Sequence, residues 1–281
     1  MKLSILFVAM VLFTNGKAPV DRHSLTPTTP SPTSKSNSAR ILSWNKNQVI
    51  AHRGAWKKKS LPENSIAALD EAVRLGCYGS EFDVHMTADS ILVVNHDADF
   101  FGLKIAKTTY KDLLKKQLSN GEPIPTLEAY LKAGMKQKKT KLILEIKPSN
   151  VSQAWDMATA DKSVAMVKRL KAGPWVDYIS FGYDILQRVR TLDPKANVAY
   201  LKGDVPLETL KEDGFYGADY HYSVYQKGEW FAKAKELGLT INAWTVNEVK
   251  DMNWLLDNKV EFITTNEPEL LFETIKARRN K

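Results

Sequence analysis

The sequence is poor in cysteine, which excludes one common way of stabilising a fold. Cys77 is the only cysteine among 281 residues, so no intramolecular disulfide can form. Apolar residues make up 43% of the chain, which is enough for one large core or two modest ones. The fold must therefore depend on its hydrophobic core.

Runs that would indicate a membrane protein or a nucleic-acid-binding protein are also missing. Beyond the first residues, no apolar run is long enough for a transmembrane helix. The formal net charge is +8, but the lysines are spread along the chain without arginine-rich runs or interleaved aromatic residues. The charge favours an anionic small molecule or surface as partner and gives no indication of nucleic-acid binding.

The N-terminal segment has the pattern of a signal peptide followed by a linker. MKLSILFVAMVLFTNG combines one lysine with an apolar stretch that is too short to span a bilayer comfortably. The Ser/Thr/Pro-rich stretch SLTPTTPSPTSKSNS follows, which disfavours the alternative of a buried strand or helix. We expect a signal peptide over residues 1–18, a linker over 19–40, and export to the periplasm or the medium.

Residues 41–281 have the pattern of one domain in which β-rich runs alternate with helical segments. Eight βα units in about 240 residues predict an α/β fold, a TIM barrel. One further apolar run, ILVVNHD, follows the second strand as a short excursion. The eight strand candidates are QVIAHRG, GSEFDVHMT, KLILEIKP, VDYISFGY, NVAYLKG, GADYHYS, LTINAWTV and VEFITTN.

Two carboxylates mark the end of the second strand, where a TIM barrel carries its catalytic groups. Glu81 and Asp83 are two residues apart, so both point inward, while Phe82 and Val84 face the helices. Inward carboxylates repel each other unless a cation lies between them. A solvated strand edge is the alternative, but it requires the strand to lie elsewhere. The pattern favours a divalent cation with oxygen ligands, Mg²⁺ or Ca²⁺.

A third carboxylate, Glu145, ends the third strand in LILEIKP. A charge among apolar neighbours is costly unless it is paired. Lys147, two residues later, is a candidate partner, which would make the pair purely structural. Metal binding by Glu145 is the other interpretation, and the two roles are compatible.

Two histidines lie at the C-terminal ends of other predicted strands. His52 ends the first strand and His96 ends the excursion. Either one alone is more typical of a structural histidine, but two beside a carboxylate cluster indicate acid and base chemistry near neutral pH. Asp97 is expected to orient His96 or to turn the loop. His85 is expected to lie beyond the end of its strand, without a catalytic role.

The motifs AHRG, PENS, EFDVHMTAD, LVVNHD, IPTLEAYL, LILEIKP, INAWTVN and FITTNEP occur in the order found in the glycerophosphodiester phosphodiesterase family. The chain resembles that family from about residue 47 to residue 275. The resemblance implies three sets of site residues: catalytic His52 and His96, phosphate- and substrate-binding Arg53, Lys147 and Trp244, and metal-binding Glu81, Asp83 and Glu145.

The implied activity is metal-dependent hydrolysis of a glycerophosphodiester, such as glycerophosphocholine or glycerophosphoethanolamine, to glycerol 3-phosphate and an alcohol. One histidine would act as general base and the other as general acid. PENS puts Glu63 and Asn64 at the start of the next helix, and Gly54 is expected to let the backbone approach the phosphate.

Several positions depart from the family pattern without removing an implied catalytic group. Asn95 stands where a second histidine is usual, TADS replaces TKDG at 87–90, and TNEP replaces TDxP at 265–268. Two other functions stay open. A phospholipase D-like enzyme acting on intact phospholipids or sphingolipids would need an apolar rim, whereas these loops read WKKKSLPEN and LKGDVPLET. A noncatalytic binding module would be expected to lose a catalytic residue, and all are present.

Overall fold

The computed structural model describes residues 42–279. The predicted signal peptide (1–18) and the whole of the predicted linker (19–40) lie outside these residues, so both stay predictions. Within the described part, no helix has the length and apolar character needed to cross a membrane.

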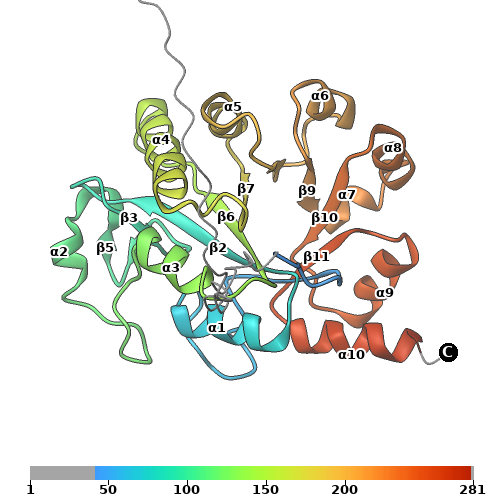
Figure 1. The fold of residues 1–281 in the computed structure, drawn as a ribbon, viewed down its shortest axis with the longest axis horizontal. Helices are drawn as coiled ribbons and strands as arrows, with labels where there is room; N and C mark the ends of the chain where they lie inside the picture. The colour runs from blue at the N-terminus through green and yellow to red at the C-terminus, as the bar shows by residue number, and fades with distance from the viewer. Residues whose placement is uncertain (1–41, 280–281) are drawn as a thin grey trace, which may run out of the picture. The chain divides into compact units, whose positions relative to one another are not determined.

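The prediction of a TIM barrel is confirmed. Within residues 42–279, eight parallel strands pair in the ring order β1, β2, β6, β7, β8, β9, β10, β11, and β11 pairs with β1 to close the ring (Figure 1). The strands are β1 Val49–Ala51, β2 Gly79–Met86, β6 Lys141–Ile146, β7 Val176–Ser180, β8 Val198–Tyr200, β9 Gly217–His221, β10 Thr240–Trp244 and β11 Phe262–Thr265.

Helices follow the strands and lie around the barrel (Figure 1). Side-chain caps define where several of them begin: Ser65 Oγ accepts the amide proton of Ala68 at 3.0 Å, which starts the first helix. The helices are α1 Ile66–Leu75, α3 Leu127–Gly134, α4 Gln153–Leu170, α5 Tyr183–Leu192, α6 Leu207–Glu212, α7 Tyr222–Tyr225, α8 Trp230–Leu237, α9 Val249–Asp257 and α10 Pro268–Arg279.

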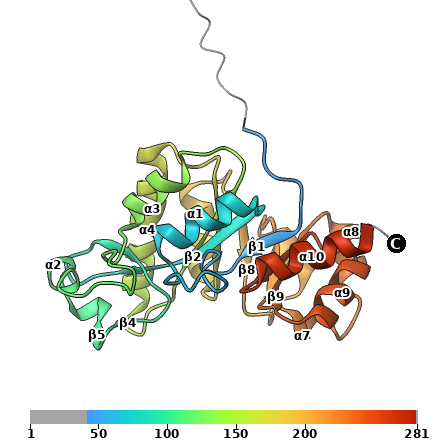
Figure 2. The ribbon, with the colours of Figure 1, turned by 90° about the horizontal axis from the view of Figure 1, so that it is seen from below.

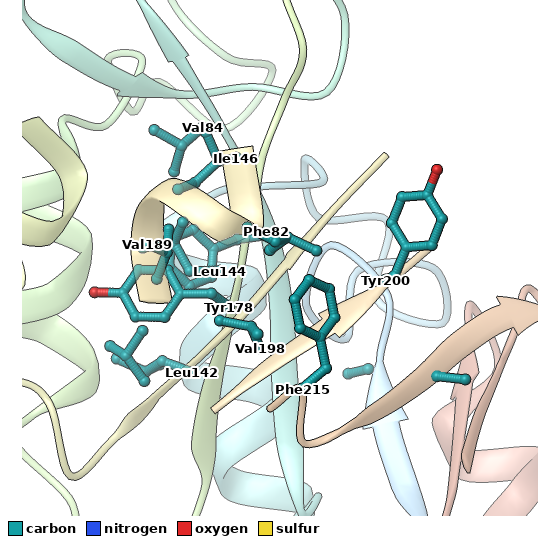
Figure 3. Close-up of a cluster of buried hydrophobic side chains, with 14 of the residues drawn as sticks. Phe82, Val84, Leu142, Leu144, Ile146, Tyr178, Val189, Val198, Tyr200 and Phe215 are labelled. Carbon is teal, nitrogen blue, oxygen red and sulfur yellow. The ribbon is translucent and has the colours of Figure 1, made fainter. Parts of the chain in front are cut away.

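Alternation along the strands divides the core into two layers. Side chains that face the helices form the larger layer, and Figure 3 shows Phe82 and Val84 of β2 beside Leu144 and Ile146 of β6. The side chains facing the barrel axis form a small apolar cluster, Ile50, Ile143, Ile179 and Leu201. This inner cluster fills the barrel below the polar residues at the strand ends.

The excursion after the second strand is also confirmed, and it has a small core of its own. Its first strand, β3 (Leu92–Val94), runs antiparallel to the end of β2. The remaining elements lie together at one side in both views (Figure 1, Figure 2). They are β4 Asp99–Phe100, β5 Leu103–Lys104, the 3₁₀ helix η1 Ile105–Lys107 and α2 Tyr110–Leu113, with the core residues Val93, Phe100, Ile105, Leu113 and Ile124.

Candidate active site

Three carboxylates meet inside the barrel at the C-terminal ends of β2 and β6. Glu81, Asp83 and Glu145 each offer an oxygen within 4.8 Å of the others. They are only 3%, 1% and 6% exposed. The register explains the meeting, because Asp83 pairs with Glu145 across the two parallel strands. The inward direction predicted from the spacing of two residues is therefore correct.

Ionisation of all three carboxyl groups would give the cluster more negative charge than its neighbours neutralise. Burial, then Asp83, raises the pKa of Glu145 to about 8, and burial raises the pKa of Glu81 well above its usual range. Burial acts in the same direction on Asp83, but Lys147 and a hydrogen bond from Asn64 bring its pKa below the ordinary value. Repulsion among these groups makes the site electrostatically incomplete as it stands.

The donor set fits a divalent cation. Glu81 Oε1 is buried without a hydrogen-bond partner, and the only partner of buried Glu145 Oε1 is the Lys147 ammonium group. A buried, unpartnered oxygen costs free energy, so the one at Glu81 calls for a ligand. Carboxylate oxygens are the donors that Mg²⁺ and Ca²⁺ prefer.

Lys147 is the single lysine in contact with this cluster within the described residues. Its Nζ lies 3.0 Å from Glu145 Oε1 and 3.2 Å from Asp83 Oδ1. Burial opposes its charge, but the two carboxylates raise its pKa above the ordinary value. The predicted Lys147 and Glu145 pair is present, and it does not use up the cluster's negative charge.

Asn64 fixes Asp83 from the loop before α1. Its Nδ2 donates to Asp83 Oδ2 at 2.8 Å, and its Oδ1 accepts from the Asp83 backbone amide at 3.1 Å. Asn64 has a φ of 59°, a left-handed conformation that asparagine tolerates better than most residues. The PENS motif located this residue at the helix start, but its contact with Asp83 depends on how the loop folds back over β2.

Arg53 lies between the carboxylates and the pocket. Its backbone amide donates to Glu81 Oε2 at 2.7 Å, and its Nη1 lies 2.9 Å from Glu63 Oε2. Its Nε is buried without a hydrogen-bond partner. One guanidinium donor is therefore still available to an anionic ligand.

Gly54 is required by packing on α1. It has a φ of 81°, and a Cβ at this position would lie 2.7 Å from the backbone carbon of Ala68. Close contact with the helix therefore explains why glycine is required here. The expectation that Gly54 lets the backbone approach the phosphate stays a prediction.

His52 is held by an amide that follows the neighbouring strand, β11. Its Nδ1 donates to Asn266 Oδ1 at 2.8 Å, and its Nε2 lies 4.0 Å from Glu81 Oε2. Burial, followed by the charge of Arg53, lowers the pKa of His52 to about 4. Asn266 was noted in the sequence only as a departure in TNEP, and its contact with His52 was not foreseen.

His96 enters the same pocket from the excursion. Its Nδ1 donates to Asp97 Oδ1 at 2.7 Å, which confirms the expected orienting contact. The expectation for His85 was wrong in one respect, because this residue lies inside β2 and not beyond it. Pairing with β3 lengthens β2 to Met86, and His85 Nε2 then donates to the backbone oxygen of His96 at 3.1 Å.

Seven of the eight predicted site residues line one pocket of about 130 Å³, and Asp83 lies directly behind them. The far wall contains Phe181 and Trp244, whose rings meet edge to face at 5.4 Å. Larger hollows of about 670 and 410 Å³ lie elsewhere on the described part of the chain, but neither is lined by the carboxylate cluster. The small pocket is therefore the candidate active site.

Comparison with known proteins identifies relatives over most of the chain. The model of the glycerophosphoryl diester phosphodiesterase family matches residues 52–270. A glycerophosphodiester phosphodiesterase from Caldanaerobacter subterraneus is 27% identical over 248 residues, which cover 82% of this chain and 98% of that protein.

Solved structures with the same fold include two informative relatives. A glycerophosphodiester phosphodiesterase from Parabacteroides distasonis is 45% identical, with a TM-score of 0.80 over 84% of this chain and all of that one. An Oleispira antarctica phosphodiesterase, solved in complex with the product sn-glycerol-3-phosphate, is 25% identical, with a TM-score of 0.70 over 82% of this chain and 97% of that one.

Proposed function

The chain belongs to the glycerophosphoryl diester phosphodiesterase family, and we propose that it hydrolyses glycerophosphodiesters, such as glycerophosphocholine or glycerophosphoethanolamine, to glycerol 3-phosphate and an alcohol. The observation that supports this most strongly is the buried cluster of Glu81, Asp83 and Glu145 beside two histidines and an arginine in one pocket. Such a constellation suits an anionic diester that must be both bound and protonated on its leaving group.

Glu81, Asp83 and Glu145 are the proposed ligands of a divalent cation, Ca²⁺ or Mg²⁺. When bound, the cation would neutralise charge that develops on the phosphoryl oxygens. Arg53 adds to this from the protein, because its unpartnered Nε can donate to a nonbridging oxygen. Lys147 supplies a second positive charge at the same wall.

The hydrogen bonds of the histidines support different roles for them. Asn266 accepts from His52 Nδ1, so Nε2 keeps its lone pair and can take a proton from the attacking hydroxyl. His96 donates from Nδ1 to the carboxylate of Asp97, which orients its ring. In this scheme His52 is the general base, and His96 donates its proton to the leaving alkoxide as the phosphorus–oxygen bond breaks.

The attacking hydroxyl is proposed to be the substrate's own 2-hydroxyl. A group already tethered to the phosphate gains an effective concentration that a separate water lacks. Its attack would expel the head-group alkoxide and leave a cyclic phosphodiester of glycerol, which a water molecule would then open to glycerol 3-phosphate. The test is an analogue without the 2-hydroxyl, assayed at equal concentration and saturating metal. Equal rates on the two compounds would contradict internal attack and leave water as the nucleophile.

The overall proposal is tested with purified protein and two substrates, glycerophosphocholine and glycerophosphoethanolamine, with glycerol 3-phosphate release as the readout. Each is assayed with and without a chelator. We expect turnover of both that is lost on chelation and restored by added cation. No release from either substrate, or faster cleavage of an intact phospholipid, would contradict the substrate class.

Export is proposed on the N-terminal pattern alone. The mature chain is expected to begin between about residues 15 and 25, where the apolar stretch ends. N-terminal sequencing of protein from the medium or the periplasm measures this directly. An active cytoplasmic protein that retains Met1 would contradict the proposal.

A further inference from the structure

A buried carboxyl group that the proposed mechanism does not use lies across the barrel from the carboxylate cluster. Asp219 is on β9, four strands from β2 in the ring of eight. Its neighbours Ala218 and Tyr220 pack among the helix-facing residues, so the Asp219 side chain faces the barrel interior. Asp219 is 2% exposed and forms part of the wall of the active-site pocket.

This carboxyl group lies in an incompletely bonded polar set that we call the polar ledge: Asp219, Asn242 and Thr264. Asn242 pairs with Asp219 in register and donates from Nδ2 to Thr264 Oγ1 at 2.8 Å. Asp219 Oδ1 and Asn242 Oδ1 are both buried without a donor. The ledge therefore has an excess of acceptors.

A purely structural role explains this arrangement poorly, because the same barrel contains a satisfied example. Asp177, on β7 at the other end of the barrel, accepts from Asn197 Nδ2 at 3.0 Å and lies 2.9 Å from Lys141 Nζ. Asp219 has no cation partner, and its Oδ1 has no hydrogen-bond donor. Leaving a buried acceptor unpartnered destabilises a fold, so its place in a ligand pocket suggests that a ligand supplies the donor.

The chemistry of the opposite walls decides which part of a ligand reaches the ledge. Arg53 and Lys147 line the pocket on the β1 and β6 side, where a phosphate is attracted. A wall that contains a carboxyl group and lacks a cation does not attract phosphate, but its oxygens can accept the proton of an uncharged hydroxyl. Trp244 lies directly above, since its Nε1 donates to the Asp219 backbone oxygen at 2.7 Å, and its ring offers an apolar face to a carbon chain.

We propose that Asp219 and Thr264 form a hydroxyl subsite that binds the terminal hydroxyl of the substrate's glycerol group and so orients the diester across the pocket. This inference rests on the proposed function and extends it to a determinant of specificity. It predicts selection for a polyol with a free end, because an analogue that ends in a methyl group leaves the ledge acceptors unpaired.

The test compares two ligands by calorimetry at saturating Mg²⁺: sn-glycerol 3-phosphate, and the analogue with a methyl group in place of the terminal CH₂OH. We expect the natural compound to bind the unaltered protein about tenfold more tightly. Asp219→Leu keeps the branching at Cγ and removes both oxygens, so the two affinities should become equal through weaker binding of the natural compound. Asp219→Asn keeps an acceptor and should retain part of the preference.

Asp177→Asn is the matched control, because it makes the same change inside the same barrel away from the pocket, and it should keep the tenfold preference. Equal binding of the two ligands by the unaltered protein would overturn the subsite, as would an equal loss for both ligands in Asp219→Leu. If the leucine variant does not fold, Thr264→Val decides, and an undiminished preference there overturns the proposal. Turnover of glycerophosphoethanolamine, measured in parallel, separates failure of the subsite from failure of the proposed function.

Discussion

Both ends of this barrel contain buried charged groups, but only at one end do these groups have matching partners. At the N-terminal end, Lys141 and Asp177 form a balanced pair, and Lys141 Nζ also donates to the Pro174 oxygen at 3.1 Å and lies 5.0 Å from the centre of the Trp44 ring. At the C-terminal end, Lys147 faces three carboxylates. One end is complete without a ligand, and the other is not.

The difference shows how a structural charge can be told from a functional one in a single scaffold. Burial alone does not distinguish them, since Asp177 and Glu145 are similarly buried at 8% and 6% exposure. The number of partners does distinguish them. Asp177 is matched by one lysine and one amide donor, whereas three carboxyl groups share Lys147 and Glu81 Oε1 has no hydrogen-bond partner.

The largest effect on turnover is expected from removing one of the three carboxylates that are proposed to bind the cation. Glu81→Ala should lower cation-dependent turnover by about 10³-fold, because the charge stabilisation at the phosphate is lost. The fold should survive, since removing one of three like charges relieves repulsion. Release of glycerol 3-phosphate and a thermal unfolding curve measure the two effects. Full activity of this variant in the presence of a chelator would refute the metal assignment.

The second-largest loss of turnover is expected from substituting the histidines. His52→Ala and His96→Ala are each expected to lower turnover by about 10²-fold, the scale of a lost general acid or base. His85→Ala is the control, because His85 contacts only the backbone of the His96 loop, and its loss should cost much less. Turnover near that of the unaltered enzyme in either of the first two variants would remove that residue from the mechanism.

The sequence was sufficient for the barrel and for most of the site because both depend on local periodicity. Alternating strands and helices indicate the ring, and inward positions at strand ends follow from a repeat of two residues. Asn64 and Asn266 were not assigned because their contacts join segments distant in sequence. Asn64 reaches β2 from the loop before α1, and Asn266 follows β11, which pairs with β1 only when the barrel closes.

Two further misses have physical reasons of their own. His85 was placed beyond its strand because nothing in GSEFDVHMT reveals that an antiparallel neighbour will lengthen β2. Asp219 was overlooked although GADYH shows the same alternation as EFD, with Ala218 and Tyr220 pointing outward. A lone inward carboxyl becomes informative only when its missing partners are known, and these lie on β10 and β11.

The contrast between the ends also predicts a pH-dependent effect on stability. Burial raises the pKa of Asp219 from its ordinary value of 3.8 to about 7. Between those values the folded protein holds a proton that the unfolded chain releases, so this group's contribution to stability falls as pH rises through the window and is least above pH 7. Asp219→Asn removes the penalty and should stabilise the protein by on the order of 3 kcal/mol at pH 8.

Thermal unfolding of metal-free protein at pH 4 and pH 8 measures this difference. The gain from Asp219→Asn should be small at the lower pH, where the carboxyl is protonated in both states. An equal gain at the two pH values would show that Asp219 is not protonated in the folded protein.

The smallest effect is expected at the N-terminal end of the barrel, where Lys141 and Asp177 form a pair. Here the substitution should lower the free energy of unfolding, and not raise it. Asp177→Asn makes the same change of one oxygen to an amide, but here it removes the negative charge that pairs with buried Lys141. The asparagine still offers an acceptor to Lys141, so the cost should be about 2 kcal/mol, the scale of one hydrogen bond to a charged group. The free energy of unfolding from denaturant titration measures it, and kcat/KM should stay unchanged because Asp177 does not line the active-site pocket. Stabilisation by Asp177→Asn, or a loss of activity in a folded variant, would contradict the division between a satisfied end and a ligand-binding end.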